Sequence, residues 1–408
     1  MKIIQIGLDF GTTNTGISAR FEDGSITLLK DKDVSMKSFP SEIYFINRDT
    51  LFVGAEAQKQ AESHKGNGRH IRWIKRSLPK KLDAINIFSK MYLVEDLVAI
   101  IIKHAKEKVE KSYPINWGEV SLKVGYPVVL GEDNEESEIA KERMNKALRL
   151  AGFDNWELVP EPVAVAHFYS NKIKNGKKCL IFDCGGGTTD LSFVEYNKNI
   201  KNGFKILGNT GIMRAGREFD KSLFMKSLAP HLGYRMLYNF MGEEMEVPRT
   251  IYDALSNPAE AQKLVSYKHH KHIMLAVNIA KSEEFLNLRF AVDNNQSTYL
   301  LGKSEDLKID LSTNETAQKA ISLKSNFNVY STYDDLDKAS IFVQEVIINM
   351  INNFCSDKPI PDLVIMTGGM SKHLLIKNFV FNQFKSISKD SFLYEDTDAI
   401  VLGLAAMS

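Results

Sequence analysis

Cysteine is scarce in this chain of 408 residues: Cys179, Cys184 and Cys355 are the three present, and none forms a C-x-x-C pair. Neither a zinc site nor a disulfide framework is therefore indicated, and so few thiols suit a reducing compartment. Long apolar runs are missing as well, since no stretch approaches the ~20 residues of a membrane-spanning helix. The N-terminus, MKIIQIGLDF, is interrupted by Gln5 and Asp9 and does not read as a signal peptide. We expect a cytoplasmic protein without a membrane partner.

An excess of one charge is also missing, because 52 Lys and Arg face 51 Asp and Glu. Such a balance gives no support for a nucleic-acid partner. Two phosphate-binding signatures are absent too: the chain has no G-x-x-x-x-G-K-[ST], and no G-x-G-x-x-G opens a helix, which excludes P-loop and Rossmann sites. At roughly 100–200 residues per domain, the length predicts two or three domains.

What the chain does contain is a repeated pattern. Residues 3–18 read IIQIGLDFGTTNTGIS, and residues 179–194 read CLIFDCGGGTTDLSFV. Each is an apolar strand, an Asp, a Gly turn, a Thr-Thr pair and a second apolar strand. Two related segments so far apart predict two similar lobes, and the alternation of strands and helices between them predicts layered α/β sheets.

Apolar periodicity places the other elements. The expected helices cover 93–109, 137–151, 161–169, 217–229, 259–270, 273–287, 335–354 and 398–407. Further strands are expected at 40–46, 120–130, 156–159 and 361–369. The polar stretch 288–332 has weak periodicity, which predicts strands and loops.

The first Gly turn, residues 9–14, suits an anion. A hairpin with glycine at its tip presents unpaired backbone N–H groups, and threonine hydroxyls add donors. Asp9 would repel a phosphate, so we expect it to face a divalent cation between itself and the phosphates. Taken alone, the motif is equally well explained as an ordinary turn.

The second turn, residues 183–190 (DCGGGTTD), changes that balance. Three consecutive glycines carry a large entropy cost on folding, which is expected where backbone must approach a ligand. Two such hairpins facing each other predict a cleft that holds a polyphosphate from both sides. Gly368 and Gly369, after an apolar strand, could approach a planar group or a sugar, although most Gly-Gly pairs are simple turns.

In this order, the motifs resemble the actin/hexokinase/heat-shock ATPase superfamily, and more closely the DnaK-type heat-shock chaperones. Pro40-Ser41 with VGAEA (53–57) resembles that family's "PS…F…GxxA", and VGYP (124–127) resembles its "VTVP". LVPEPVAVAHFY (158–169) resembles "INEPTAAALAY", and GREFD (216–220) resembles "GGxDFD". The resemblance covers essentially the whole chain and implies an α/β fold of two actin-like ATPase lobes, duplicated ribonuclease-H-like units around a nucleotide cleft.

The resemblance also implies a division of the chain. Lobe I would comprise 1–173, with the first phosphate hairpin and a connecting helix at 161–170. Lobe II would comprise 174–394, with the second hairpin and the adenosine motif, and a terminal helix (395–408) would return to lobe I. The chaperones continue into a peptide-binding domain, so we expect this chain to lack one and to act through an unknown protein partner or co-chaperone.

Site roles implied by the resemblance are carried over position by position. Asp9 and Asp183 would hold Mg²⁺ through its water shell, and Lys75 would steady the transferred phosphoryl group. Glu161, with Asp183 or Asp190, would position the attacking water. The other positions would contact ATP or ADP: Gly11, Thr12, Thr13, Asn14, Gly185, Gly186, Gly187, Thr188, Gly216, Lys281, Gly368 and Gly369.

Some of these positions also allow a plainer interpretation. Lys75 could be a solvated helix lysine, and Lys281, which resembles the adenosine-side lysine, could equally be a surface charge. Three positions depart from the family: Asn278 stands where it has a ribose-binding Glu, Thr397 where it has an Asp, and Arg217 where it has a glycine. The departures concern the base and ribose more than the phosphates.

We therefore expect a chaperone-like ATPase that binds Mg-ATP, hydrolyses it slowly to ADP and phosphate, and works as a nucleotide-driven switch. One alternative is an actin- or MreB-like filament-forming ATPase, which shares the phosphate loops but lacks the PS…F and GxxA stretches. Another is a small-molecule kinase of the same superfamily, for which no dedicated general base is evident. A binding module without chemistry is also open, although Lys75 and the carboxylates argue against it.

Overall fold

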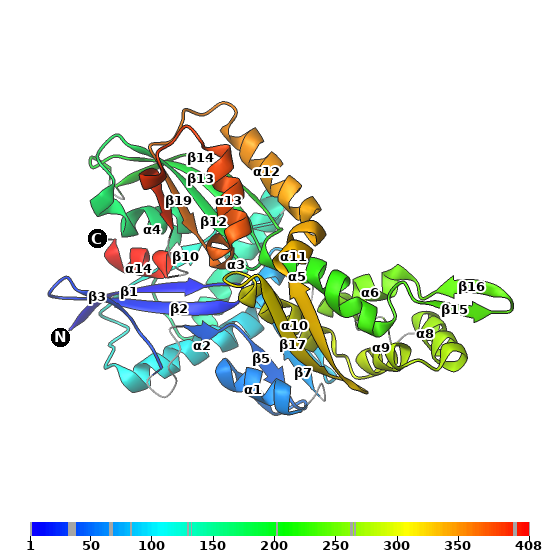
Figure 1. Ribbon diagram of the computed structural model, residues 1–408. Helices are drawn as coiled ribbons and strands as arrows, with labels where there is room; N and C mark the ends of the chain where they lie inside the picture. The colour runs from blue at the N-terminus through cyan, green and yellow to red at the C-terminus, as the bar shows by residue number, and fades with distance from the viewer. Residues whose placement is uncertain are drawn as a thin grey trace.

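Two sheets of the same topology organise the protein. The computed structural model describes residues 2–407 except for 32–37, 65–67, 82–83, 129, 132, 201–202, 262–263, 265–266 and 395–397. The first sheet runs β11-β10-β1-β2-β3, with β4 on β2, and the second runs β20-β19-β12-β13-β14. In each, a central strand (β1 or β12) forms an antiparallel hairpin with the next strand and pairs in parallel on its other side. The repeated pattern of the sequence therefore corresponds to two similar sheets (Figure 1).

The strands of these sheets have the following bounds. The first sheet contains β1 (Ile3–Phe10), β2 (Asn14–Phe21), β3 (Ile26–Leu28), β4 (Phe39–Pro40), β10 (Ser121–Tyr126) and β11 (Glu157–Pro160). The second contains β12 (Lys178–Cys184), β13 (Thr189–Tyr196), β14 (Phe204–Ile212), β19 (Leu363–Thr367) and β20 (Phe392–Tyr394). The expected hairpins at 3–18 and 179–194 are confirmed.

Helices cover both sheets and lie between them. The first sheet is packed by α2 (Val94–Ser112) and α3 (Asn134–Leu150), and the second by α12 (Ile341–Cys355) and α13 (Leu374–Gln383). Between the sheets, α4 (Glu161–Phe168) packs against α14 (Ala399–Ala406). The predicted helices at 93–109, 137–151, 161–169 and 398–407 are confirmed within a few residues.

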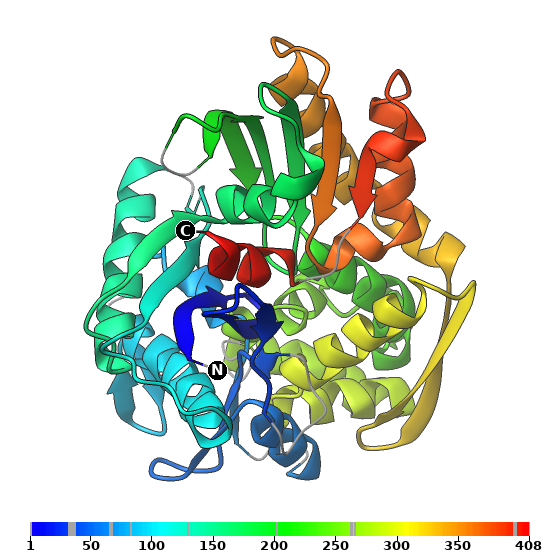
Figure 2. The same ribbon diagram turned by 90° about the vertical axis from the view of Figure 1, so that its left-hand side faces the viewer.

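The terminal helix α14 is bound tightly to the beginning of the chain, as the adjacent red and dark blue ribbons of Figure 2 show. The amide of Gln5 in β1 donates to the carbonyl oxygens of Leu404 (2.7 Å) and Met407 (2.6 Å). On its other side, Gly403 lies so close to the carbonyl oxygen of Ala164 in α4 that a Cβ would collide with it. Only glycine allows this helix crossing.

Smaller elements surround the first sheet. They are β5 (Ile43–Phe45), β6 (Leu51–Val53), β7 (Arg69–Ile71), β8 (Ile85–Ile87), β9 (Lys90–Tyr92), α1 (Ala55–Ser63) and the 3-10 helix η1 (Ile74–Ser77). The elements that extend the side of the second sheet are α5 (Gly216–Leu223), α6 (Arg249–Leu255), α7 (Pro258–Ala261), α8 (Tyr267–Ala280), α9 (Glu283–Asp293), α10 (Ser297–Asp310) and α11 (Tyr333–Ala339), with hairpins β15 (Leu237–Phe240)–β16 (Glu243–Glu246) and β17 (Thr316–Ser322)–β18 (Asn326–Thr332).

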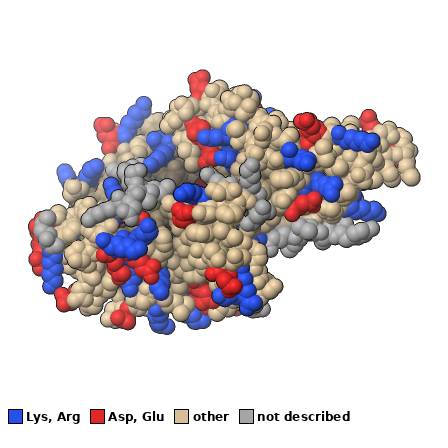
Figure 3. All heavy atoms as spheres, turned by 90° about the horizontal axis from the view of Figure 1, so that it is seen from below, with Lys and Arg blue, Asp and Glu red and all other residues tan. Residues whose placement is uncertain are grey.

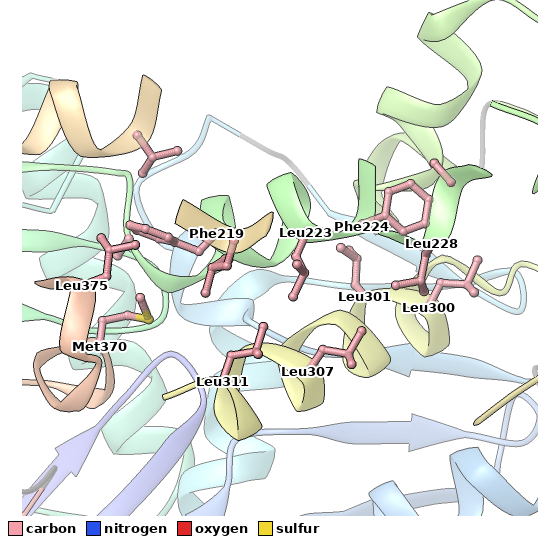
Figure 4. Packing of buried hydrophobic residues seen from close by; sticks show 14 of the residues in the cluster. Phe219, Leu223, Phe224, Leu228, Leu300, Leu301, Leu307, Leu311, Met370 and Leu375 are labelled. Atoms are coloured by element: carbon pink, nitrogen blue, oxygen red, sulfur yellow. The ribbon is translucent and has the colours of Figure 1, made fainter. Parts of the chain in front are cut away.

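The largest error of the sequence-based assignment lies at 288–332. This stretch contains the end of α9 and the whole of α10, followed by the β17–β18 hairpin, where only strands and loops were expected. The side of α10 that packs inward carries Leu300, Leu301 and Leu307 together with the polar Ser304 and Lys308. Those buried polar residues obscure the apolar periodicity. Figure 4 shows the leucines of α10 packing against the Phe and Leu side chains of the segment that contains α5.

Two other expected helices are interrupted. A break falls at Lys281, whose φ of 49° ends α8, and Ser282 caps α9 by accepting a hydrogen bond from the backbone N–H of Phe285. The expected helix 335–354 is divided at Ser340 into α11 and α12. None of the described helices combines the length and apolar character of a membrane span.

Candidate functional site

The two hairpin turns are built alike and face each other. The backbone N–H of Gly11 donates to Asn14 (2.9 Å), and that of Gly185 donates to Thr188 (3.0 Å), so both turns close with the same hydrogen bond. A Cβ on Gly186 would lie 2.8 Å from Thr13 Oγ1, because the tips are in close approach. Gly186 and Gly187 of the second turn are thus required by Thr13 and Thr12 of the first.

A cavity of about 280 Å³ opens beside these turns. The predicted site residues on its wall are Asp9, Gly11, Thr12, Thr13, Asn14, Lys75, Glu161, Asp183, Gly185, Gly186, Gly187, Thr188, Gly368 and Gly369. Gly368 has a φ of 85°, and a Cβ there would collide with Asp183 Oδ1. The third glycine motif is therefore fixed by a left-handed backbone and by contact with the second hairpin.

Three predicted residues lie elsewhere. Gly216 is behind the wall, where its N–H donates to Gly185 O (3.1 Å) and the N–H of the next residue donates to Gly186 O (2.8 Å). Asp190 lines a separate cavity of about 10 Å³ together with Glu161 and Asp183, a space the size of one water molecule. Lys281 is exposed at the junction of α8 and α9 and is not among the residues that line the large cavity.

Lys75 forms the centre of the charged part of the site. Its Nζ lies 3.0 Å from Glu161 Oε1, and both side chains are buried. Burial by itself lowers the pKa of Lys75, but the carboxylates of Glu161, Asp9 and Asp183 outweigh that effect and raise it. The lysine is therefore held charged, which rules out a solvated surface lysine at this position.

The surrounding carboxyl groups have pKa values above their ordinary range. Burial, reinforced by Glu161, raises the pKa of Asp9 to about 7. Burial also raises the pKa of Asp190 to about 7 and that of Asp183 well above its ordinary value. One lysine does not neutralise this group, so the site favours an added cation.

Magnesium fits this requirement. Among the described residues, Oδ1 of Asp9 and Oδ1 of Asp190 are buried without a hydrogen-bond partner. The described part of the chain holds no group of three or more acidic, His or Cys side chains that could bind a metal directly. Mg²⁺ keeps several waters and takes one or two carboxylates beside phosphate oxygens, so Asp9 and Asp183 could hold it through water.

Two charged cavity residues that the sequence analysis missed come from α10. Glu305 and Lys308 line the wall, and Lys308 Nζ lies 2.7 Å from Asp220 Oδ1 and 3.3 Å from Gly216 O. The pair has an acid-x-x-Lys spacing, which Asn278 and Lys281 lack. The signal was present in the sequence, but the expectation of strands and loops at 288–332 concealed it.

The remaining departures from the family have different positions. Asp398 lines the cavity at the start of α14, while Thr397 lies outside the described residues. Arg217 turns its guanidinium to the ring of Trp73, at 4.6 Å from the ring centroid. It is not among the residues that line the large cavity.

Two sheets of one topology, with facing hairpins beside an acidic cavity that contains a lysine, define a class: this is the actin-like ATPase fold. Residues 137–292 match the family model described as "Hsp70 protein". This part of the chain is therefore similar to the Hsp70 family, and the expected resemblance to the nucleotide-binding part of the DnaK-type chaperones is confirmed there.

Curated relatives agree with this match at low identity. The chain is 31% identical over 208 residues to "Chaperone protein DnaK" of Metamycoplasma hominis, which covers 50% of this chain and 32% of the relative. It is 30% identical over 216 residues to the protein of the same name from Mycoplasmopsis agalactiae, covering 53% and 33%. With that of Thermoplasma acidophilum it shares 23% over 303 residues, covering 69% and 46%. The chain spans between a third and a half of the length of these relatives.

Proposed function

We propose that this chain binds Mg-ATP between the two hairpins, hydrolyses it slowly to ADP and phosphate, and passes the nucleotide state to a protein partner as a change in the closure of two lobes. The lobes are those predicted, 1–173 with the terminal helix and 174–394. The proposal is carried by one observation: the facing glycine turns share a cavity with the buried Lys75–Glu161 pair.

The binding step rests on backbone and hydroxyl donors. The N–H groups of the two turns and the hydroxyls of Thr12 and Thr13 would hold the phosphates, as turns of this kind do for anions. Bound Mg²⁺ would neutralise phosphate charge from the side of Asp9 and Asp183. On the adenosine side, Lys308 replaces Lys281, because it lines the cavity with Glu305.

The chemical step needs little more than positioning and electrostatics. Lys75 would stabilise charge on the transferred phosphoryl group. The small cavity between Glu161, Asp183 and Asp190 would hold the attacking water, and their carboxylates would accept its hydrogen bonds. Asp190, whose pKa is raised by burial to about 7, is suited to accept its proton near neutral pH.

We propose the cellular role of this chain from its relatives alone. DnaK-type proteins are chaperones, and we place this chain with them as a cytoplasmic ATPase that acts with a co-chaperone. We propose no nucleic-acid or membrane partner. Figure 3 shows Lys and Arg interspersed with Asp and Glu over the visible face, in line with a formal net charge of +1.

Phosphate release from Mg-ATP tests this function. We expect slow release by the wild type and a loss of about 10²–10³-fold in Lys75→Ala, the effect of removing one donor to a developing charge. Asp183→Ala should fall similarly, because Mg²⁺ loses a carboxylate. Lys281→Ala is the matched control, an exposed lysine that should keep the wild-type rate. Calorimetry with ATP checks that each variant still folds and binds.

Three results would contradict the proposal. A wild type that neither binds nor hydrolyses ATP removes the nucleotide site, and binding without release removes the chemistry. The switch fails if small-angle scattering gives the same distance distribution with ATP and with ADP.

A further inference from the structure

A short segment of lobe I, residues 72–76, contacts lobe II through its side chains and carries Lys75. It follows β7 and contains most of η1. Trp73, just before η1, has φ 58° and ψ 29°, the left-handed region that bulky side chains rarely adopt. Such a backbone persists only where surrounding contacts enforce it, and these contacts identify what the segment does.

The indole of Trp73 is buried in lobe II, although its backbone belongs to lobe I. It is 7% exposed and belongs to the cluster that contains Phe219 of α5 and Leu301 of α10, whereas its neighbours Ile71 and Ile74 belong to the core of the first sheet. The side chain of Trp73 therefore points away from those of its neighbours, and its left-handed backbone directs the ring into lobe II.

Two guanidinium groups hold the ring. The Cζ atom of Arg72 lies 4.5 Å from the ring centroid, and that of Arg217 in α5 lies 4.6 Å from it. Indole is the ring that binds cations best, and the interaction strengthens away from water. The arginine that replaces the family's glycine thus has a contact that only a tryptophan or similar ring at position 73 supplies.

The flanking residues make this contact rigid. Arg72 Nη2 lies 2.9 Å from Glu305 Oε2 of α10, and Arg76 Nη2 donates to Met213 O (3.0 Å). Within the segment, the N–H of Arg76 donates to Trp73 O (3.1 Å). A displacement of Trp73 must therefore move the turn that places Lys75.

We propose that Trp73 is a positioning residue: its indole, in contact with Arg72 and Arg217, makes the placement of Lys75 depend on the two lobes being closed. When the lobes open, the ring leaves its slot and Lys75 is withdrawn from the phosphoryl group. Closure and assembly of the catalytic site are then one event. This inference rests on the proposed ATPase function, since it concerns when that site is complete.

Steady-state kinetics separate positioning from binding. We expect Trp73→Phe and Arg217→Gln to lower kcat by about tenfold, and Trp73→Ala by up to about 100-fold, because a shift of about 1 Å in a catalytic group can have that effect. The Kd for ATP should change less than threefold, since the residue is not on the cavity wall. Trp117→Phe, a tryptophan of lobe I distant from the segment in sequence, is the matched control and should keep the wild-type kcat.

Fluorescence reports the movement without catalysis. The chain has three tryptophans, so Trp117→Phe/Trp156→Phe leaves Trp73 as the sole indole. Acrylamide quenching of this protein should be low with Mg-ATP and at least twofold higher without nucleotide. The same variant carrying Arg217→Gln should show higher quenching in both states.

The outcomes distinguish the two proposals. A wild type that binds no ATP overturns the proposed function and this inference with it. If the wild type hydrolyses ATP while folded Trp73→Phe and Arg217→Gln keep its kcat, only the inference is overturned. Should ATP bind without hydrolysis, quenching decides, and equal quenching with and without nucleotide overturns the inference.

Discussion

The two hairpins have the same backbone arrangement but carry different residues at their tips. Asp9 and Asp183 each stand two residues before the glycine that begins the turn, and both turns close with the same backbone hydrogen bond. At the tip, however, Thr12 and Thr13 occupy the positions that glycines occupy in the second hairpin. Thr12 faces Gly187 and Thr13 faces Gly186, the crosswise contact that a two-fold relation produces.

The difference shows that the tips of the two hairpins are complementary in shape: threonine side chains of one tip face glycines of the other. Hydroxyls can stand on one side of the cavity only because side chains are missing on the other. The Thr-Thr pairs that make the two segments look alike are not equivalent: Thr189 of the second pair is buried in β13 and donates to Arg214 O (2.7 Å).

The largest effect should come from adding one methyl group to the second tip. Gly186→Ala would bring a Cβ to 2.8 Å from Thr13 Oγ1, and Gly187→Ala would bring one to 3.0 Å from Thr12 Oγ1. We expect the hairpins to separate and the Kd for ATP to rise by about 10–100-fold, measured by calorimetry, because the donors of the two turns no longer converge.

The control for this prediction is one residue away. Gly185→Ala would place its Cβ 3.8 Å from Thr188 O, an ordinary contact, so its Kd should stay near that of the wild type. Equal losses in all three variants would mean that the loop needs flexibility, not space, and the complementary fit would be refuted.

A smaller effect should separate the threonines by role. Thr12→Val and Thr13→Val remove a hydroxyl from the cavity wall and should weaken ATP binding by about tenfold, since a hydrogen bond to a charged group contributes about 1.5–3 kcal/mol. Thr189→Val leaves Arg214 O without its buried donor and should lower the free energy of unfolding by about 1–3 kcal/mol. Urea titration and calorimetry on the same three proteins measure both quantities.

The comparison predicts that the threonines of the first tip affect ATP binding, whereas Thr189 affects the free energy of unfolding. If Thr189→Val weakens ATP binding as much as Thr13→Val while stability is unchanged, then the second Thr-Thr pair does act at the phosphates, and the structural distinction between the hairpins is wrong.

The smallest effect concerns the acidic residues and pH. Burial raises the folded-state pKa of Asp9 and Asp190 from 3.8 to about 7. Between these values the folded protein binds more protons than the unfolded chain, so stability without Mg²⁺ should fall as the pH rises from 5 to 7. For a chain of this length, a loss of 1 kcal/mol lowers the unfolding midpoint by roughly 1–2 °C. Calorimetric melting from pH 4 to 8 measures it.

Two comparisons sharpen this result. Mg²⁺ should raise the midpoint more at pH 7.5 than at pH 5, and Asp9→Asn should flatten the pH dependence. Glu42 has the opposite shift: its pKa is lowered from 4.5 to about 2 despite its burial, by Arg72 and His70, so its contribution to stability grows up to about pH 5 and the fall should be read above that pH. A midpoint that rises from pH 5 to 7 would contradict the charge assignment.

Much of this architecture could be predicted from the sequence, for reasons that are local. Alternating apolar residues and a glycine turn specify each hairpin, and the apolar face of α2 or the Glu161-Pro162 start of α4 specifies a helix. The triple glycine indicated close approach correctly, although the atoms approached proved to be the hydroxyls of Thr12 and Thr13. The catalytic and ligand roles of these residues stay predictions.

What the sequence concealed depends on partners distant in the chain. Lys308 is buried because Asp220 and Gly216 O receive its charge, and a lysine of that kind does not look like part of a helix face. Lys281 had the more convincing local context and lies at the surface. Nor could Trp73 be distinguished from a core aromatic residue, since its neighbours Ile71 and Ile74 pack into the core of the first sheet.

The hydrogen bonds from Gln5 to α14 have a consequence for how the protein is made. They join positions about 400 residues apart, so β1 emerges from the ribosome long before the helix that completes its sheet. Non-local contacts of this kind slow folding, and an incomplete sheet is prone to aggregate. The face of β1 that packs against α14 would therefore stay exposed during synthesis until α14 has emerged.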